Sequence, residues 1–359
     1  MKRRMSVAAM VLLFILFSCF YARAEDEMQR EIKFGKEVSE EIEQHWERVS
    51  DPVKIAHLSM ICEKIKPHMI RTLPFEIRII QEKSLNAFSL PGGIIYMTTG
   101  ILDFLHSDAE IGAIIAHEMI HADRRHVMLQ MAQSQRISIF ALALILVSGG
   151  KAAPAFLTSM AQIAITNAYS KDLEKEADVE GLYALQKAGY PPAAALTVME
   201  GLAEEQLRHP YVDPGIFMDH PYVKERVAYL SKIIRENNWP IERKKVLHML
   251  VVDVVTDERS TTLLVDGVKV WSGPDESDVR KLFLSIKEKL DRDYQMELAP
   301  YEIEVIELFD NKKGIRVGPT LLVSEPLPGG VDPLIFLRTG LVERLHQAKA
   351  SHPMADYLH

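Results

Sequence analysis

The chain has 359 residues, of which 48% are hydrophobic and 26% are charged, and its formal net charge at pH 7 is -8. This length predicts two domains, and the composition is that of a globular protein rather than a disordered chain or a protein with many membrane spans. We expect no nucleic-acid partner, because an acidic chain without a basic cluster would repel phosphates.

The N-terminus resembles an export signal. Three basic residues at positions 2–4 precede an apolar run over residues 7–20, and Ala22-Arg23-Ala24 has the small residues that signal peptidase cuts after. We therefore predict a signal peptide over residues 1–24 and an exported, periplasmic protein that could associate with the outer membrane. An uncleaved anchor and a lipoprotein attached through Cys19 stay open as alternatives, although the run is short against the roughly 20 residues that span a bilayer.

The next segment predicts helices followed by a small sheet. Apolar residues recur at helical spacing over residues 25–71, with a break at Asp51-Pro52, which indicates two helices. Residues 75–81 alternate between apolar and polar, and residues 94–98 are rich in β-formers, so we expect a small antiparallel sheet. Ser107 and Asp108 are suited to begin a further helix with an apolar stripe.

Residues 137–147 are almost entirely apolar. Eleven residues are too few to cross a bilayer. Two interpretations stay open, namely a core helix and a hydrophobic hairpin that contacts a membrane surface or the rim of the active site. Further helices are expected near residues 170–188, 192–206 and 223–237, and the Asn237-Asn238-Trp239-Pro240 segment indicates a domain boundary.

The C-terminal part predicts a smaller α+β domain. Strands are expected within residues 246–271, followed by a helix over 278–292, and a second cycle of strands within 303–323 is followed by a helix over 333–349. No period of 34 residues is present, which argues against a helical repeat array. The fold class is thus α+β, with a mainly helical domain over residues 25–239 and a second domain over residues 240–359 of unknown role.

The residues that carry chemistry lie within the helix predicted after Ser107. His117-Glu118-Met119-Ile120-His121 is an H-E-x-x-H segment. Residues four apart lie on one face of a helix, so both imidazoles can reach one cation, and zinc accepts such ligands. The cation would lower the pKa of a water molecule, whose proton Glu118 could accept and pass to a leaving amine. By itself this short motif also occurs by chance.

A third ligand is expected from another helix. Glu174 and Asp178 are four residues apart in the helix predicted to begin at Ser170, so they share one face, whereas Glu176 points elsewhere. A ligand at the first position and a carboxylate that orients a histidine at the second is a sound arrangement. Taken alone, the two acidic residues could equally form a solvated face with salt bridges.

Four segments together resemble the zinc endopeptidases of peptidase family forty-eight in the metallo class, which includes Oma-type, HtpX-type and BepA-like enzymes. The resemblance covers roughly residues 30–235. The matching segments are Asn86-Ala87-Phe88-Ser89-Leu90-Pro91-Gly92-Gly93 with the strand to Gly100, the H-E-x-x-H segment to His126, Glu174 to Asp178, and His220-Pro221 with Arg226. It implies a mainly helical, gluzincin-like protease domain.

The resemblance also implies residue roles. Glu174 becomes the third zinc ligand, with Asp178 in support behind the ligands. Asn86, Ala87, Phe88, Gly92 and Gly93 become candidates for substrate binding, where a strand edge pairs with substrate backbone.

The family pattern includes three further residues of this chain. His220 matches a histidine that covers the metal as a removable plug in BepA-like members, although a capping or core role fits it equally well. His126 is expected to be structural, because on a continuous helix it would lie far around the axis from His121. Arg226 belongs to the pattern without an assigned role.

The sequence therefore predicts a metalloendopeptidase with one zinc ion per chain and protein or peptide substrates. The expected substrates are misfolded or stalled envelope proteins, and the alternative is a chaperone or assembly factor for outer-membrane proteins with little proteolysis. The C-terminal domain departs from BepA-like enzymes, which carry helical repeats there, so partner recognition is not transferred. The oligomeric state is not predicted.

Overall fold

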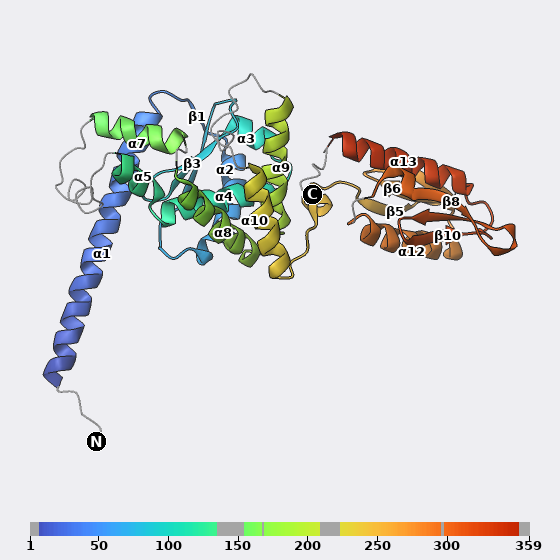
Figure 1. The fold of residues 1–359 in the computed structure, drawn as a ribbon, viewed down its shortest axis with the longest axis horizontal. Helices are drawn as coiled ribbons and strands as arrows, with labels where there is room; N and C mark the ends of the chain where they lie inside the picture. The colour runs from blue at the N-terminus through green and yellow to red at the C-terminus, as the bar shows by residue number, and fades with distance from the viewer. Residues whose placement is uncertain (1–6, 135–153, 167–168, 209–222, 296–297, 352–359) are drawn as a thin grey trace. The chain divides into compact units, whose positions relative to one another are not determined.

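The computed structural model of the chain describes residues 7–134, 154–166, 169–208, 223–295 and 298–351 (Figure 1). The chain divides into two compact units, Met1–Ile233 and Ile234–His359. His220 and residues 137–147 lie outside the described residues, so the predictions for them remain untested. Among the described residues, none of the helices combines the length and apolarity that crossing a bilayer needs.

The first unit is mainly helical. Its elements are α1 (Val7–Ile42), β1 (Arg48–Val49), α2 (Pro52–Ile65), β2 (Glu76–Ile80), β3 (Ala87–Ser89), β4 (Ile94–Thr98), α3 (Thr99–Phe104), α4 (Asp108–Asp123), α5 (His126–Ser134), α7 (Pro154–Thr166), α8 (Lys171–Lys187), α9 (Ala193–Arg208) and α10 (Val223–Glu236). The predicted break at Asp51-Pro52 is real, since the Asp51 carboxylate caps α2 by accepting from the backbone N–H groups of Val53 and Lys54.

The four-stranded sheet of this unit has the order β1-β2-β4-β3. The expected antiparallel arrangement holds for the outer pairs, but β2 and β4 pair in parallel, with Glu76 opposite Ile94 and Ile80 opposite Thr98. The reason lies in the connection, because the chain between β2 and β4 first turns back through β3. Strand β3 therefore forms an edge of the sheet, beside helix α4.

The second unit is α+β, as expected, and confirms the predicted fold class. A short helix α11 (Arg243–Val246) precedes β5 (Val252–Thr256), β6 (Ser260–Val265), β7 (Val268–Pro274), α12 (Ser277–Asp293), β8 (Ile303–Glu307), β9 (Lys313–Val317), β10 (Thr320–Ser324) and α13 (Leu334–Ser351). The strand predicted to start near residue 246 begins later, because His248 and Leu250 adopt positive φ angles.

The second unit consists of two strand-strand-strand-helix repeats. Each repeat forms an antiparallel three-stranded sheet, in the orders β5-β6-β7 and β8-β9-β10. Helix α12 packs on β5 and β6 of its own repeat and on β10 of the other, while α13 packs on β8, β9 and β7. Figure 1 shows the two helices on opposite faces of the strands. Each repeat thus completes the core of the other.

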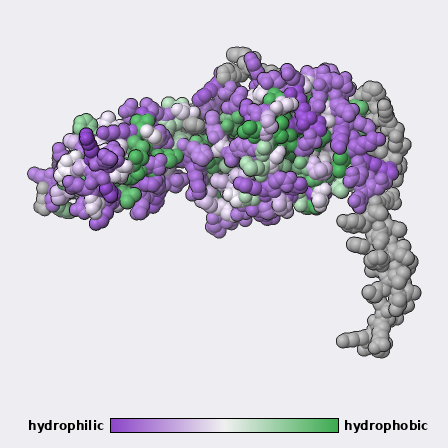
Figure 2. All heavy atoms as spheres, turned by 180° about the vertical axis from the view of Figure 1, so that it is seen from behind, coloured by the Kyte–Doolittle hydropathy of each residue, from purple (hydrophilic) through white to green (hydrophobic). Residues whose placement is uncertain are grey.

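Each unit has its own hydrophobic core. In the first, α1, the sheet, α5 and α7 bury residues such as Val38, Tyr96 and Met160, and in the second Trp271 stacks on Phe283 at 4.8 Å between ring centroids. On the face shown in Figure 2 the surface of both units is mostly hydrophilic, with apolar atoms in patches between polar ones.

Candidate active site

Helix α4 brings both histidines of the H-E-x-x-H segment to one point. The Ser107 hydroxyl caps the helix by accepting from the backbone N–H of Glu110, as its position predicted. His117 and His121 are buried, and their Nε2 atoms lie 3.0 Å apart. The spacing of four on a regular helix produces this meeting, since both side chains leave the same face.

Helix α8 supplies the third side chain of the cluster. The Glu174 carboxylate lies 3.7 Å from His117 Nε2 and 3.5 Å from His121 Nε2. The close approach of α8 to α4 depends on Gly181, because a Cβ there would lie 3.3 Å from the backbone N and Cα of His117. In the described part of the chain, these three residues form a His-His-Glu group able to hold a metal ion.

The spacing of the three ligand atoms fits a zinc ion. A tetrahedral ion with bonds of about 2.0–2.1 Å needs neighbouring ligand atoms roughly 3.3 Å apart. The two Nε2 atoms are 3.0 Å apart, one Glu174 oxygen is 3.5 Å from His121 Nε2, and the other is 3.7 Å from His117 Nε2, so each of these distances is close to that value. Two imidazoles and one carboxylate also leave a position for water, as catalytic zinc sites do.

A buried network lies behind His117. Its Nδ1 is 3.1 Å from Asp178 Oδ1, and Arg226 of α10 donates two hydrogen bonds to Asp178, at 2.8 and 2.6 Å. The Tyr229 hydroxyl also donates to Asp178. Burial by itself raises the pKa of Asp178, but the charges of Arg226 and His117 outweigh it and hold this pKa well below its usual range.

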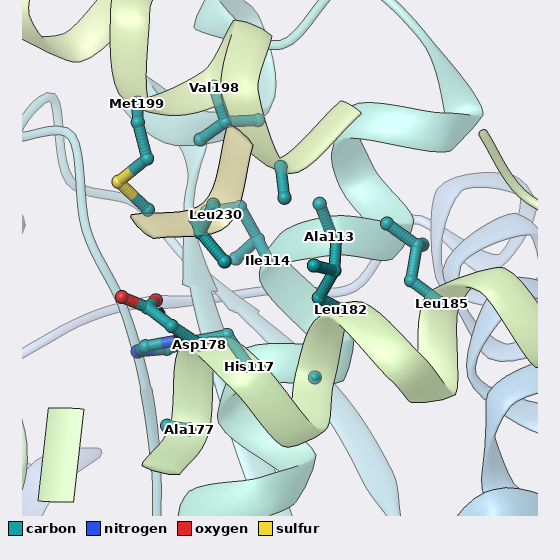
Figure 3. A pocket seen from close by; sticks show the side chains of 12 residues that line it. Ala113, Ile114, His117, Ala177, Asp178, Leu182, Leu185, Val198, Met199 and Leu230 are labelled. Atoms are coloured by element: carbon teal, nitrogen blue, oxygen red, sulfur yellow. Dashed lines mark ion pairs between the residues drawn. The ribbon is translucent and has the colours of Figure 1, made fainter. Parts of the chain in front are cut away.

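Figure 3 shows His117 and Asp178 facing each other beneath apolar side chains of α8, α9 and α10, among them Leu182, Met199 and Leu230. These side chains and the His117–Asp178 pair line one small pocket. Arg226, which the family pattern includes without a role, balances the charge of Asp178 through its two hydrogen bonds.

Glu118 is 1% exposed and lies in the same acidic environment. Burial raises its pKa to about 8, with the His117 charge acting against this and the Glu174 carboxylate reinforcing it. The pKa of His117 is also raised, since Asp178 and the two glutamates outweigh the effect of burial. The causes differ: burial accounts for most of the Glu118 shift, whereas the neighbouring carboxylates account for the His117 shift. A bound divalent cation would lower both pKa values, because it favours a charged carboxylate and a neutral imidazole.

His126 was expected to be structural because a continuous helix would carry it away from His121. The helix is not continuous: α4 ends at Asp123, and Arg125 has a φ of 59° before α5 begins. The chain turns there, and His126 Nδ1 lies 2.9 Å from His121 Nδ1. Its Nε2 is 3.5 Å from Glu176, the residue expected to point elsewhere.

Sequence reasoning did not identify Tyr169, whose ring stacks on that of His121 with centroids 4.2 Å apart and planes at 21°. It precedes the helix predicted from Ser170, and nothing in the local pattern distinguishes it. Ser89 on β3 was identified only within the family segment; it is fully buried, and its strand contacts α4, the helix that carries Glu118. Strand β3 therefore runs beside the catalytic-base candidate.

The candidate substrate-binding residues fall into two groups. Asn86, Ala87 and Phe88 lie on or next to the edge strand β3, all three buried, and Asn86 donates to the Ile165 carbonyl at 3.1 Å. Gly92 and Gly93 form a buried turn with positive φ angles. A Cβ on Gly92 would lie 2.6 Å from the Ile32 Cα atom of α1, so this turn packs against a helix.

The fold and the site together define a metal-dependent peptidase of the H-E-x-x-H type. The model of peptidase family M48 matches residues 55–234, which is half of the chain. The chain belongs to this family, and the prediction of a metalloendopeptidase is confirmed. The match ends at residue 234, so the C-terminal unit lies outside it.

Several curated proteins are similar to this chain. The mitochondrial metalloendopeptidase OMA1 of Arabidopsis thaliana is 35% identical over 132 residues, which cover 37% of this chain and 26% of that protein. The beta-barrel assembly-enhancing protease of Escherichia coli K12 is 25% identical over 190 residues, 50% of this chain and 39% of that protein. OMA1 of Saccharomyces cerevisiae is 27% identical over 191 residues, which cover 52% of this chain and 54% of that protein. The chain thus spans between about a quarter and about half of the length of these relatives.

Proposed function

We propose that the chain is a zinc-dependent endopeptidase in which His117, His121 and Glu174 bind the metal and Glu118 is the general base. One observation carries this proposal: the Nε2 atoms of His117 and His121 lie 3.0 Å apart, each has an oxygen of Glu174 within 3.7 Å, and the buried Glu118 carboxylate is next to them in sequence. Zinc bound there would polarise the scissile carbonyl and lower the pKa of an attacking water molecule.

The residues of the chain carry the proton and hold the geometry. Glu118 accepts a proton from the attacking water and delivers it to the nitrogen of the leaving amine. Asp178, 3.1 Å from His117 Nδ1, favours a proton on that atom and so leaves Nε2 for the metal, while Arg226 balances the Asp178 charge. The β3 edge beside α4 would pair with the substrate backbone, with Asn86, Ala87 and Phe88 in or next to it. We retain His220 as a proposed fourth, regulatory ligand.

The proposed substrates are misfolded or stalled proteins of the bacterial envelope, and the proposed location is the periplasm. The basic N-terminus, the apolar run and the Ala22-Arg23-Ala24 sequence support export. Relatives named beta-barrel assembly-enhancing protease support an envelope role, whereas relatives named mitochondrial metalloendopeptidase support processing in another compartment. A chaperone or assembly function is the alternative, because the first of these names refers to assembly.

The test compares purified wild type with Glu118→Gln on a denatured protein substrate, with bound zinc quantified in both. We expect cleavage to fall by about 10²- to 10⁴-fold in Glu118→Gln, because the base is lost while the ligands remain. Zinc should stay near one per chain. His220→Ala in parallel should cleave faster if His220 restrains the site.

Two results would contradict the proposal. Absence of bound zinc in the wild type would refute the proposed metal site. Zinc-loaded wild type that cleaves no faster than Glu118→Gln would refute the role of Glu118 as the base. In the second case the chaperone alternative is tested directly: Glu118→Gln that fully restores envelope integrity in a deletion strain would favour it.

A further inference from the structure

The two candidate histidine ligands are supported by different chemistry. His117 Nδ1 faces a carboxylate, Asp178, at 3.1 Å, whereas His121 Nδ1 faces another imidazole, that of His126, at 2.9 Å. His126 is fully buried, and its ring meets that of His121 edge to face, at 81° between the planes. The contact between His121 and His126 depends on Arg125, whose left-handed conformation turns the chain between α4 and α5. Helix α5 begins at His126.

The direction of this hydrogen bond follows from the metal. Nε2 of His121 must present its lone pair to a cation, because that atom is the one near His117 Nε2 and Glu174. The ring proton of His121 is then on Nδ1. At 2.9 Å from a second nitrogen, that proton is donated, so His126 Nδ1 must be the acceptor.

The other nitrogen of His126 then carries a proton. His126 Nε2 lies 3.5 Å from Glu176 Oε2, and the second oxygen of that carboxylate is 3.3 Å from Arg124 Nε. His126 Nε2 makes no hydrogen bond to the described residues in this geometry, but the charge of Glu176 lies on this side of the ring and favours a proton there, and Arg124 forms an ion pair with Glu176. Tyr169 also stacks on the ring of His121, with 21° between the two planes.

We propose that His126 is a positioning residue that fixes the tautomer and ring orientation of the metal ligand His121 by accepting its Nδ1 proton, with the Glu176 carboxylate on the Nε2 side of His126. This inference rests on the proposed metal site. Histidine ligands commonly donate their second N–H to a carboxylate or a carbonyl. Here a neutral imidazole does this work, which adds no further negative charge to a site that already holds Glu118, Glu174 and Asp178.

The experiment measures the dissociation constant of zinc by competition with a chromophoric chelator, in the full chain. Loss of a group that orients a ligand costs roughly 10- to 100-fold in metal affinity, and we expect that loss in His126→Leu. His126→Asn should recover much of it, since its side-chain oxygen can lie near the position of Nδ1. His57→Leu, an exposed histidine outside the site, is the matched control and should bind zinc as wild type does.

A second measurement reads the hydrogen bond itself in the zinc-loaded wild type. Nitrogen NMR of labelled histidines should show His126 protonated on Nε2, with a scalar coupling between Nδ1 of His121 and Nδ1 of His126. This readout remains decisive if His126→Leu fails to fold.

The inference is overturned if folded His126→Leu and His126→Asn both bind zinc within about twofold of wild type, because a structural residue would lower only the melting temperature. It is equally overturned if His126 is protonated on Nδ1. Wild type that binds no zinc would instead refute the proposed function, so the two failures are distinguishable.

Discussion

At the scale of single residues, the main feature of the candidate site is a group of buried carboxylates. Glu118, Glu174 and Asp178 are all at least nine-tenths buried, and Arg226 is the guanidinium that contacts two of them. Burying carboxylates is unfavourable unless a charge balances them. In the metal-free protein, burial therefore favours the protonated form of Glu118 and raises its pKa to about 8.

This shift predicts how the stability of the metal-free protein depends on pH. The pKa of Glu118 is 4.5 before folding and about 8 in the fold. Its contribution is fully present below pH 4.5 and is lost as the pH rises to about 8, because the unfolded chain releases the proton first. We expect the free energy of unfolding to fall by a few kcal/mol over this interval.

Glu118→Gln isolates that contribution, because glutamine has the same shape and no charge. Denaturant unfolding of both metal-free proteins should show the variant more stable than wild type near pH 8 and similar to it near pH 4.5. Parallel pH profiles of the two proteins would show that Glu118 keeps an ordinary pKa in the fold.

At the scale of elements, Glu31 of α1 contacts the junction between α4 and α5. Glu31 is 2% exposed and accepts hydrogen bonds from Arg71, at 2.7 and 3.0 Å, and from Arg125 at 2.8 Å. Arg125 is the left-handed residue that redirects the chain toward His126. Helix α1 thus supports the active site from a distance in the sequence.

Glu31→Gln should destabilise the protein by roughly 2–3 kcal/mol, because two guanidinium groups lose a buried carboxylate. Glu27→Gln is the matched control: Glu27 also pairs with Arg125, at 2.8 Å, but its side chain is 49% exposed. Exposed pairs contribute about 0–1 kcal/mol. Chemical denaturation measures both, and equal losses in the two variants would contradict the anchoring role of Glu31.

At the scale of the whole molecule, two units with separate cores should unfold separately. Zinc would bind only the first unit, so its removal should lower the melting temperature of that unit by roughly 10 °C when the metal had been present at about a thousand times its dissociation constant. The second unit should not respond. Its core contains Trp271, which is fully buried.

The measurement uses a chain with Trp46→Phe and Trp239→Phe, which leaves Trp271 as the only tryptophan. Its fluorescence should report one transition that a chelator does not move, while calorimetry shows a second that the chelator lowers. A single transition, lowered by the chelator and followed by Trp271, would show that the units unfold together.

Local patterns in the sequence determined most of the helices and predicted which side chains meet at the proposed metal site. His117 and His121, like Glu174 and Asp178, are four residues apart, and helix geometry alone places such pairs on one face. The Ser107 cap and the break at Asp51-Pro52 are equally local, because they depend on side chains bonding to their own backbone neighbours.

Only the tertiary structure decided what depends on residues far apart in the chain. The parallel pairing of β2 with β4 follows from the path between them, and the raised pKa of Glu118 follows from its burial, to which the Glu174 carboxylate of α8 adds. His126 was misplaced because its position depends on one backbone angle at Arg125, which Glu31 of α1 helps to hold. A periodic pattern alone predicts that the helix continues past Asp123. The helix ends there because Arg125 turns the chain, and Glu31, which holds Arg125, lies 94 positions earlier in the sequence.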